Sequence, residues 1–293
     1  MNSIIIALSY AFCWGVGITL TKIALTEISP TTLLTIQVLA SVIFLSIASY
    51  WSDRQIPFSW NRLRQGIAGV FEPGLAYIIG IFGVEMTTAS NATLIGSSEV
   101  MLTILFAAVV LNEPLTRTKL LLASISVVGI VLLMLNNAEG GGQSSLTGDL
   151  LVLLGTLFAV CYVLVSKKQI STIQPLPLVA SQQLVGLIVT VFCFSALSLL
   201  NSNYEVSAAN ISLPFWLLAI GSGVMQYAIA FLLYLIALRT VQASDAAFYV
   251  ALIPVFGVAS AIVLIGEQPS LLQWIGAALI IGSSYAANQF CRN

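Results

Sequence analysis

The feature that most limits how this chain can fold is its series of long, continuous apolar segments. Each of ten such segments has roughly the 17–25 residues that an α-helix needs to cross a membrane. The apolar residues do not alternate with polar ones, which argues against β-strands. The segments are approximately 3–25, 31–50, 66–84, 90–111, 118–136, 148–168, 176–199, 213–237, 243–265 and 271–290. The pattern predicts an all-α polytopic membrane protein of ten transmembrane helices.

Composition supports this fold class and excludes several functions. Apolar residues make up 59% of the chain and charged residues 7%, whereas soluble domains average about 25% charged residues. A net charge of −1 offers no basic surface for nucleic acid. The chain has no histidine, which removes the commonest proton shuttle and zinc ligand. We therefore expect no metal, no cofactor and no enzyme activity, and a membrane-embedded enzyme is the weaker alternative.

The basic residues indicate how the helices are oriented. If the N-terminus is cytoplasmic and ten helices alternate, nine basic residues fall at cytoplasmic ends and only Lys22 falls at an outer end. This bias follows the positive-inside rule. The sequence predicts a multi-pass protein of the inner or plasma membrane with both termini in the cytoplasm. The nine residues are Arg54, Arg62, Arg64, Arg117, Lys119, Lys167, Lys168, Arg239 and Arg292.

The chain also repeats itself. A shift of 145 residues aligns Lys22 with Lys167 and Gln37 with Gln182, and a shift of 154 aligns Glu113 with Glu267. Each half has five predicted helices, so the second half enters the membrane from the opposite side, as in the inverted repeats of secondary transporters. We predict a first repeat at 1–137, a Gly/Ser linker at 138–147 and a second repeat at 148–293.

Several short motifs occur in the two halves: Trp14-Gly15, Lys22, Ser29-Pro30, Tyr162, Ser166-Lys167-Lys168, Pro175, Leu111–Leu115, Ala243–Ala246, Ile253–Phe256 and Ile265–Pro269. With these motifs the chain resembles two tandem EamA domains of the drug/metabolite transporter superfamily. The resemblance implies a ten-helix carrier of the inner membrane, often an exporter of amino acids or related metabolites. Two positions depart from it: Val100 stands where the second half has Pro254, and Ala159 where the first half has Trp14.

Two carboxylates lie deep inside predicted helices. Glu72 falls within the segment 66–84 and Glu99 near the middle of 90–111. A charge within the bilayer costs about 2.5–3.5 kcal/mol on insertion scales, so both side chains should face protein or water. They are candidates for substrate binding or proton coupling. The alternative is a protonated glutamate with a structural hydrogen bond.

Further polar and aromatic residues are candidates for a central site. The 154-residue shift pairs Glu72 with Gln226, and Gln37 pairs with Gln182. We expect both pairs to line one cavity near the midplane, and interhelical amide hydrogen bonding is the alternative. Aromatic candidates, for which packing or lipid contact is the alternative, are Trp14, Tyr77, Tyr162, Tyr227, Tyr234 and Tyr249. Candidates for gate or helix-end roles are Lys22, Glu113 and Glu267.

Taken together, these patterns predict a secondary transporter of small metabolites. Alternating access, with proton coupling as one option, suits two similar antiparallel bundles. The alternatives are a passive channel or facilitator, and a membrane partner protein without transport activity. The expected partners are a small-molecule substrate and the lipid bilayer, and not nucleic acid. The substrate, the direction of transport, the coupling ion and the oligomeric state do not follow from the sequence.

Overall fold

The computed structural model describes most of the chain, and every regular element in the described part is a helix. The prediction of an all-α protein is therefore confirmed for these residues. Glu113, Tyr249 and most of the predicted linker lie outside them. The described residues are 3–53, 59–110, 116–136, 145–200, 206–207, 209, 211–240, 250 and 252–290.

The first half contains both long continuous helices and interrupted ones. Their bounds are α1 Ser3–Ala24, α2 Pro30–Asp53, α3 Trp60–Gln65, η1 Gly66–Val70, η2 Phe71–Leu75, α4 Ala76–Met86, α5 Ala89–Gly96, α6 Glu99–Val110 and α7 Arg117–Asn136. The elements α3 to α4 follow one another without a gap. The predicted helix 66–84 thus begins earlier, at Trp60, and the predicted helix 90–111 is two helices.

The second half has a similar order of elements. Their bounds are α8 Leu146–Gln169, α9 Pro175–Leu200, α10 Leu213–Gly223, η4 Val224–Ile229, α11 Ala230–Thr240, α13 Ile253–Ser260, η5 Ala261–Ile265 and α14 Leu271–Phe290. The segments η4 and η5 are wound as π-helix, and η2 contains a kink at Glu72. The predicted helix 271–290 has the same bounds as α14.

Five helical segments in the described part are long and apolar enough to cross a membrane. They are Pro30–Ser52, Trp60–Met86, Leu146–Gln169, Pro175–Leu200 and Leu213–Arg239. Four shorter apolar helices accompany them, at Leu8–Ala24, Leu120–Leu132, Ile253–Ile265 and Leu271–Ser283. The chain is thus a multi-pass helical protein, and the count of ten spans remains a prediction.

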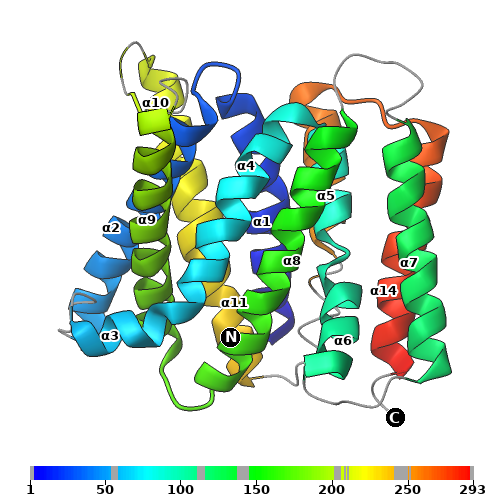
Figure 1. Ribbon diagram of the computed structural model, residues 1–293, viewed down its shortest axis with the longest axis horizontal. Coiled ribbons are helices and arrows are strands. Elements are labelled where there is room, and N and C mark those ends of the chain that lie inside the picture. Colours follow the sequence, from blue (N-terminus) through cyan, green and yellow to red (C-terminus); the bar gives the residue numbers. More distant parts are fainter. Residues whose placement is uncertain are drawn as a thin grey trace.

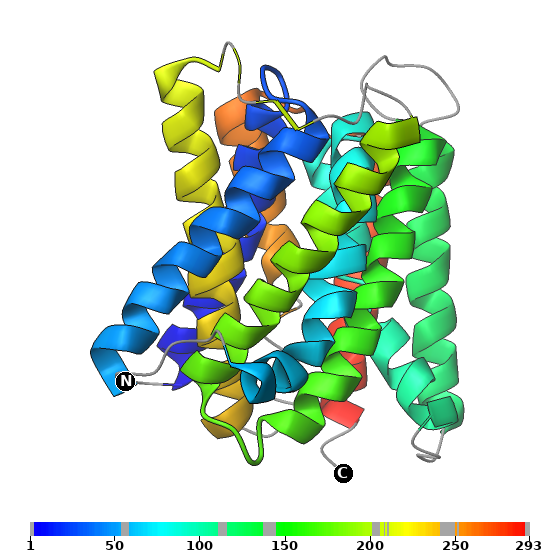
Figure 2. The ribbon, with the colours of Figure 1, turned by 60° about the vertical axis from the view of Figure 1, so that its left-hand side comes forward.

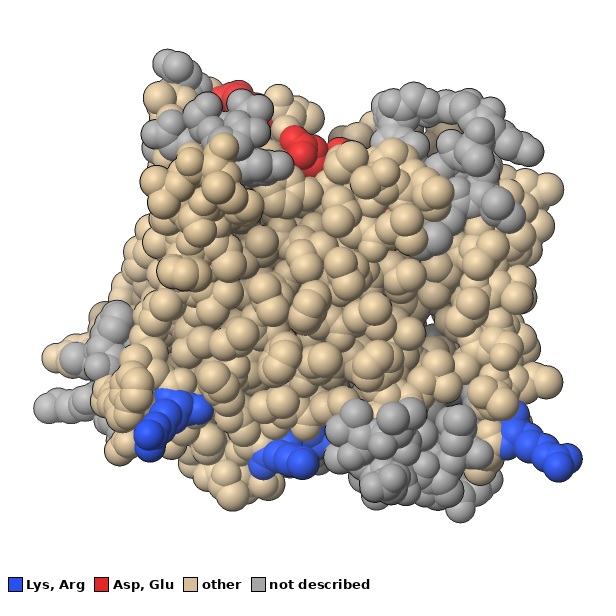
Figure 3. Space-filling view, in the orientation of Figure 1, with Lys and Arg blue, Asp and Glu red and all other residues tan. Residues whose placement is uncertain are grey.

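The helices stand side by side, and charged residues gather at the two ends of the bundle. The N and C marks both lie toward the lower end in two views (Figures 1 and 2). On the face shown in Figure 3, basic side chains lie along the lower edge and acidic ones along the upper edge, with an uncharged band between them. This separation is what a bilayer-spanning protein requires, because charges are costly in the hydrocarbon layer.

The two halves of the chain pack intimately against each other. Helix α1 packs on α11 and α13, α4 on α8, α2 on α9, and α7 on α14. Each of these pairs joins residues before the predicted linker to residues after it. The halves therefore share one core, and any cavity at its centre is lined by both.

Candidate functional site

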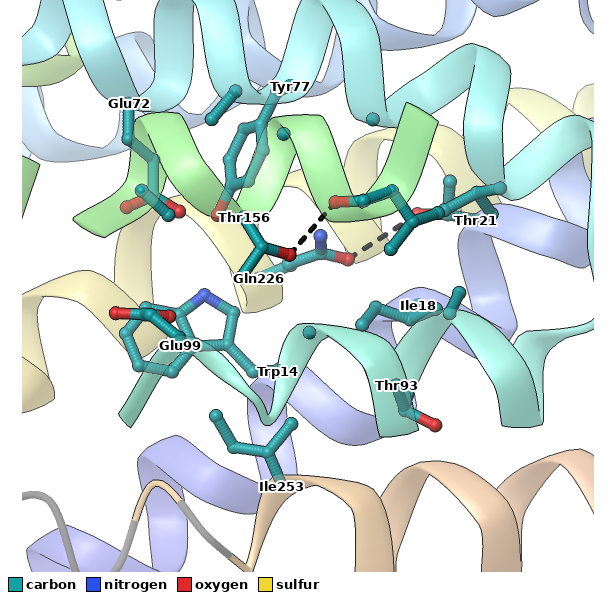
Figure 4. A pocket seen from close by; sticks show the side chains of 18 of the residues that line it. Trp14, Ile18, Thr21, Glu72, Tyr77, Thr93, Glu99, Thr156, Gln226 and Ile253 are labelled. Carbon is teal, nitrogen blue, oxygen red and sulfur yellow. Dashed lines mark hydrogen bonds between the residues drawn. The ribbon is translucent and has the colours of Figure 1, made fainter. Parts of the chain in front are cut away.

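A central cavity opens among helices of both halves. The space within it that water-sized molecules can occupy is about 150 Å³, which is smaller than the 300–1,000 Å³ of typical ligand pockets. Figure 4 shows Glu72, Tyr77, Glu99, Gln226 and Trp14 around this space. The elements α1, η2, α4, α5, α6, α8, η4, α11 and α13 all contribute lining residues.

Glu72 enters the cavity from an interruption between η1 and α4. Its backbone is extended, at φ −146° and ψ 125°, within an otherwise helical segment. Pro73 follows it, and a proline disfavours the helical conformation of the preceding residue. The side chain is 8% exposed and faces the cavity together with the hydroxyl group of Tyr77 (Figure 4). The local sequence thus both breaks the helix and directs a carboxylate inward.

Glu99 lies at a second interruption. Helix α5 ends at Gly96, and α6 begins with Glu99 itself. Between them the hydroxyl groups of Ser97 and Ser98 donate hydrogen bonds to the carbonyls of Leu94 and Ile95, each at 2.6 Å. Such back-bonding by serine offers the chain an alternative to the regular helical pattern. A carboxylate in the first turn of a helix is favoured by the helix dipole.

Aromatic side chains form one wall of the cavity. Tyr77 and Tyr227 stack with ring centroids 4.6 Å apart, and Trp14 meets Tyr234 edge to face at 5.3 Å. Phe231, behind them, contacts both Trp14 and Tyr77. Five of the six aromatic candidates line the cavity, and the sixth, Tyr249, lies outside the described residues.

Gln226 is the only one of the three candidate glutamines that lines the cavity among the described residues. It belongs to η4, and its side-chain oxygen accepts a hydrogen bond from the Thr21 hydroxyl at 3.4 Å. Glu72 and Gln226, the pair expected from the repeat, therefore lie in one cavity (Figure 4).

Gln37 and Gln182 differ from the expectation that they line this cavity. Both are fully buried between helices. The Gln37 amide donates to Thr21 at 3.0 Å and to Ser222 at 2.9 Å. The Gln182 amide donates to Ser166 at 3.0 Å. Both glutamines thus make the interhelical hydrogen bonds that were the alternative reading, because a buried amide needs partners.

The candidate gate residues lie at the acidic end of the bundle. The Lys22 ammonium donates to the carbonyls of Val84 and Glu85, at 2.9 and 2.6 Å, where the C-terminal end of α4 favours a cation. The Glu267 carboxylate accepts hydrogen bonds from the backbone amides of Ala89 and Ser90, at 2.8 and 3.1 Å. Glu267 therefore caps the start of α5. Glu113 lies outside the described residues.

A buried polar cluster at the same end was missed by sequence reasoning. Asp149 is fully buried and accepts hydrogen bonds from Thr87 and from the Asn91 amide. Gln273 donates to the Asn91 side-chain oxygen at 2.8 Å. The available signal was Ser145, which caps α8 through the Gly148 amide at 3.0 Å and so places Asp149 in the first helical turn.

Apolar helices from both halves of the chain around an internal cavity are typical of a polytopic membrane transporter. A family model described as the EamA-like transporter family matches residues 1–135 and again 146–289. The chain therefore belongs to this family, whose members transport small molecules across membranes.

Two individual proteins are similar to this chain. The "Uncharacterized transporter YcxC" of Bacillus subtilis (strain 168) is 26% identical over 219 residues, which cover 72% of this chain and 67% of that protein. One crystal structure superposes with a TM-score of 0.70 at 18% identity, covering 100% of this chain and 99% of the other. The second likeness shows the fold alone.

Proposed function

We propose that the protein is a secondary carrier that moves a small metabolite through the central cavity by alternating access. The observation that carries this proposal is the cavity itself, which both halves line and into which two interrupted helices direct carboxylates. Discontinuous helices near the membrane midplane are typical of carrier binding sites. A continuous polar stripe, which a passive channel would favour, is not a feature of the described lining, since most of it is apolar.

We also propose that the carrier is a five-plus-five inverted repeat, divided at 1–137, 138–147 and 148–293. Two contacts support it. The hydrogen bond from Gln37 to Thr21 has a counterpart from Gln182 to Ser166. The 145-residue shift aligns the two donors with each other and the two acceptors with each other. Gly69 packs on the Gln182 backbone as Gly223 packs on the Gln37 backbone. Two similar bundles that exchange such contacts can exchange conformations.

The membrane orientation belongs to the same proposal. The basic end of the bundle in Figure 3 faces the cytoplasm, which leaves both termini inside and the acidic end outside. Lys22 and Glu267 then tie helices together at the outer face. Glu72 and Glu99 are the groups through which protons would be coupled to transport.

The experiment is a counterflow assay with the purified full-length protein in liposomes. The vesicles are loaded with a mixture of amino acids, nucleosides, sugars and organic cations, and labelled solutes are added outside. A carrier accumulates a labelled solute transiently against its gradient, while a channel only equilibrates it. We expect counterflow of at least one solute class, and dissipative flux or no flux at all contradicts the proposal.

A matched pair of glycine variants links the flux to the cavity. Gly80 lines the cavity and Gly221 does not, and a Cβ atom at either position meets nothing within 4 Å. We expect Gly80→Trp to abolish counterflow by filling the cavity, whereas Gly221→Trp, on an exposed surface, keeps it. Equal flux in both variants would place the pathway elsewhere.

A further inference from the structure

The lining of the cavity is unbalanced in charge. Glu72 and Glu99 contribute two carboxylates, and no lysine or arginine is among the described lining residues. Histidine is absent from the whole chain. The cation on α1, Lys22, is not among the lining residues, and its ammonium is engaged with the carbonyls of Val84 and Glu85 at the end of α4. The two carboxylates thus have no described cationic side chain beside them, and burial makes an unneutralised charge costly.

The uncharged part of the lining suits a cation as well. The ring of Trp14 lies beside Glu99 and that of Tyr77 beside Glu72 (Figure 4). Tyr234 packs on Trp14 and Tyr227 stacks on Tyr77, and both also line the cavity. Aromatic faces attract ammonium groups, and the attraction grows when the site is dry. An aromatic or aliphatic body can pack on the remaining lining, which is largely Ile, Val and Ala.

A substrate carboxylate has no comparable partner here. Its usual partners are a basic side chain or the N-terminal end of a helix. No described lining residue is basic, and the start of α6, one of the helix starts at the cavity, already carries the carboxylate of Glu99. A zwitterionic amino acid would bring its own carboxylate against two others.

We propose that the transported substrate is an organic cation: an amine or quaternary ammonium group on an aromatic or apolar body, without a carboxylate. This inference rests on the proposed carrier function and narrows its substrate class. Glu72 and Glu99 pair with the cationic group, the aromatic side chains cover it, and Gln226 and Thr21 supply neutral hydrogen-bonding groups.

Three probes that share a phenylethyl body test whether the wild-type protein prefers a cation to a zwitterion or an anion. They are 2-phenylethylamine, a cation; phenylalanine, a zwitterion; and 3-phenylpropionate, an anion. Binding to the purified full-length protein is measured by titration calorimetry. We expect the amine to bind at least about tenfold more tightly than phenylalanine, and the anion to bind most weakly. Phenylalanine or the anion binding as tightly as the amine, or no binding of the amine, overturns the inference.

Variants then assign the selectivity to the two carboxylates. Glu72→Gln and Glu99→Gln keep the side-chain shape but not the charge, and each should weaken amine binding by about tenfold or more. Glu85→Gln is the matched control, since Glu85 is a glutamate at the end of α4 outside this cavity. Unchanged amine affinity in both cavity variants overturns the inference. If a variant fails to fold, the affinities of the three probes for the wild-type protein decide whether the site selects cations.

Counterflow of phenyltrimethylammonium, whose fixed charge prevents passage as a neutral molecule, separates this inference from the proposed function. Counterflow of this cation supports both. Counterflow of amino acids, sugars or nucleosides without any organic cation overturns the substrate class and leaves the carrier standing. Absence of counterflow for every solute contradicts the carrier itself.

Discussion

At the scale of single residues, the difference between a cavity residue and a packing residue is decided by its neighbours. Gln226 and Gln182 are both buried glutamines in long apolar helices. Gln226 lines the cavity with one weak hydrogen bond to Thr21. Gln182 donates to Ser166 and accepts from the hydroxyl of Tyr162, a lining residue, at 3.0 Å, but it does not itself line the cavity. Gln226 is therefore positioned to contact a ligand, whereas Gln182 stabilises the packing of the helices.

This difference predicts opposite effects of two similar substitutions. Gln182→Leu should lower the free energy of unfolding by about 1–3 kcal/mol, because Tyr162 and Ser166 lose their buried partner. Gln226→Leu should cost less stability and weaken ligand binding instead. Thermal unfolding in detergent, together with binding of the amine probe, measures both effects. A Gln226 variant that unfolds more readily than the Gln182 variant, with normal binding, would contradict this assignment.

At the scale of the helices, close backbone approaches hold the two halves together. A Cβ atom on Gly69 would overlap the carbonyl group of Gln182, and one on Gly223 would overlap the backbone of Gln37. The helices carrying these glycines pack tightly on α9 and α2. Small residues permit such approaches between membrane helices.

Alanine at these two glycines should therefore destabilise the protein. Gly69→Ala and Gly223→Ala each force helices apart, at a cost of about 1–3 kcal/mol. Gly221→Ala is the control, because its Cβ meets nothing within 4 Å, and alanine favours a helix by about 1 kcal/mol over glycine. Melting temperatures in detergent should fall for the first two and hold or rise for the third. Equal shifts in all three would mean that the contacts are not tight.

At the scale of the whole molecule, charge separates the two ends of the bundle. On the face shown in Figure 3, basic residues lie along one end of the bundle and acidic residues along the other, with an uncharged band between them. The positive-inside rule then assigns the basic end to the cytoplasm. This arrangement predicts that residues 61 and 144 lie on opposite sides of the membrane.

Cysteine labelling tests that orientation. The four native cysteines are first replaced, and Asn61→Cys and Ser144→Cys are then made singly. An impermeant thiol reagent added to intact cells should label position 144 and not 61, and permeabilised cells should label both. Labelling of 61 in intact cells, or of both positions equally, would refute ten spans with cytoplasmic termini.

Much of the architecture was predictable from the sequence, because the length of each apolar segment and the charges at its ends determine that helix without reference to the rest of the chain. The apolar segment 271–290 predicted α14 to the residue, since a helix apolar enough to span a membrane satisfies its own backbone and ends where polar residues begin. The family was likewise readable from the motifs, and the match over residues 1–135 and 146–289 confirms it. The depth of Glu72 and Glu99 followed from their distance to the segment ends.

Only the tertiary structure decided which polar residues meet. In a helix that is apolar on all sides, the pattern does not indicate which face turns inward. Gln37, Gln182 and Gln226 were therefore indistinguishable in the sequence, although only Gln226 reaches the cavity. The helix interruption before Glu99 depends on serine hydroxyls bonding back to the preceding turn, a choice between competing hydrogen bonds that packing settles. Length and polarity determine the helices, and contact between the two halves determines the site.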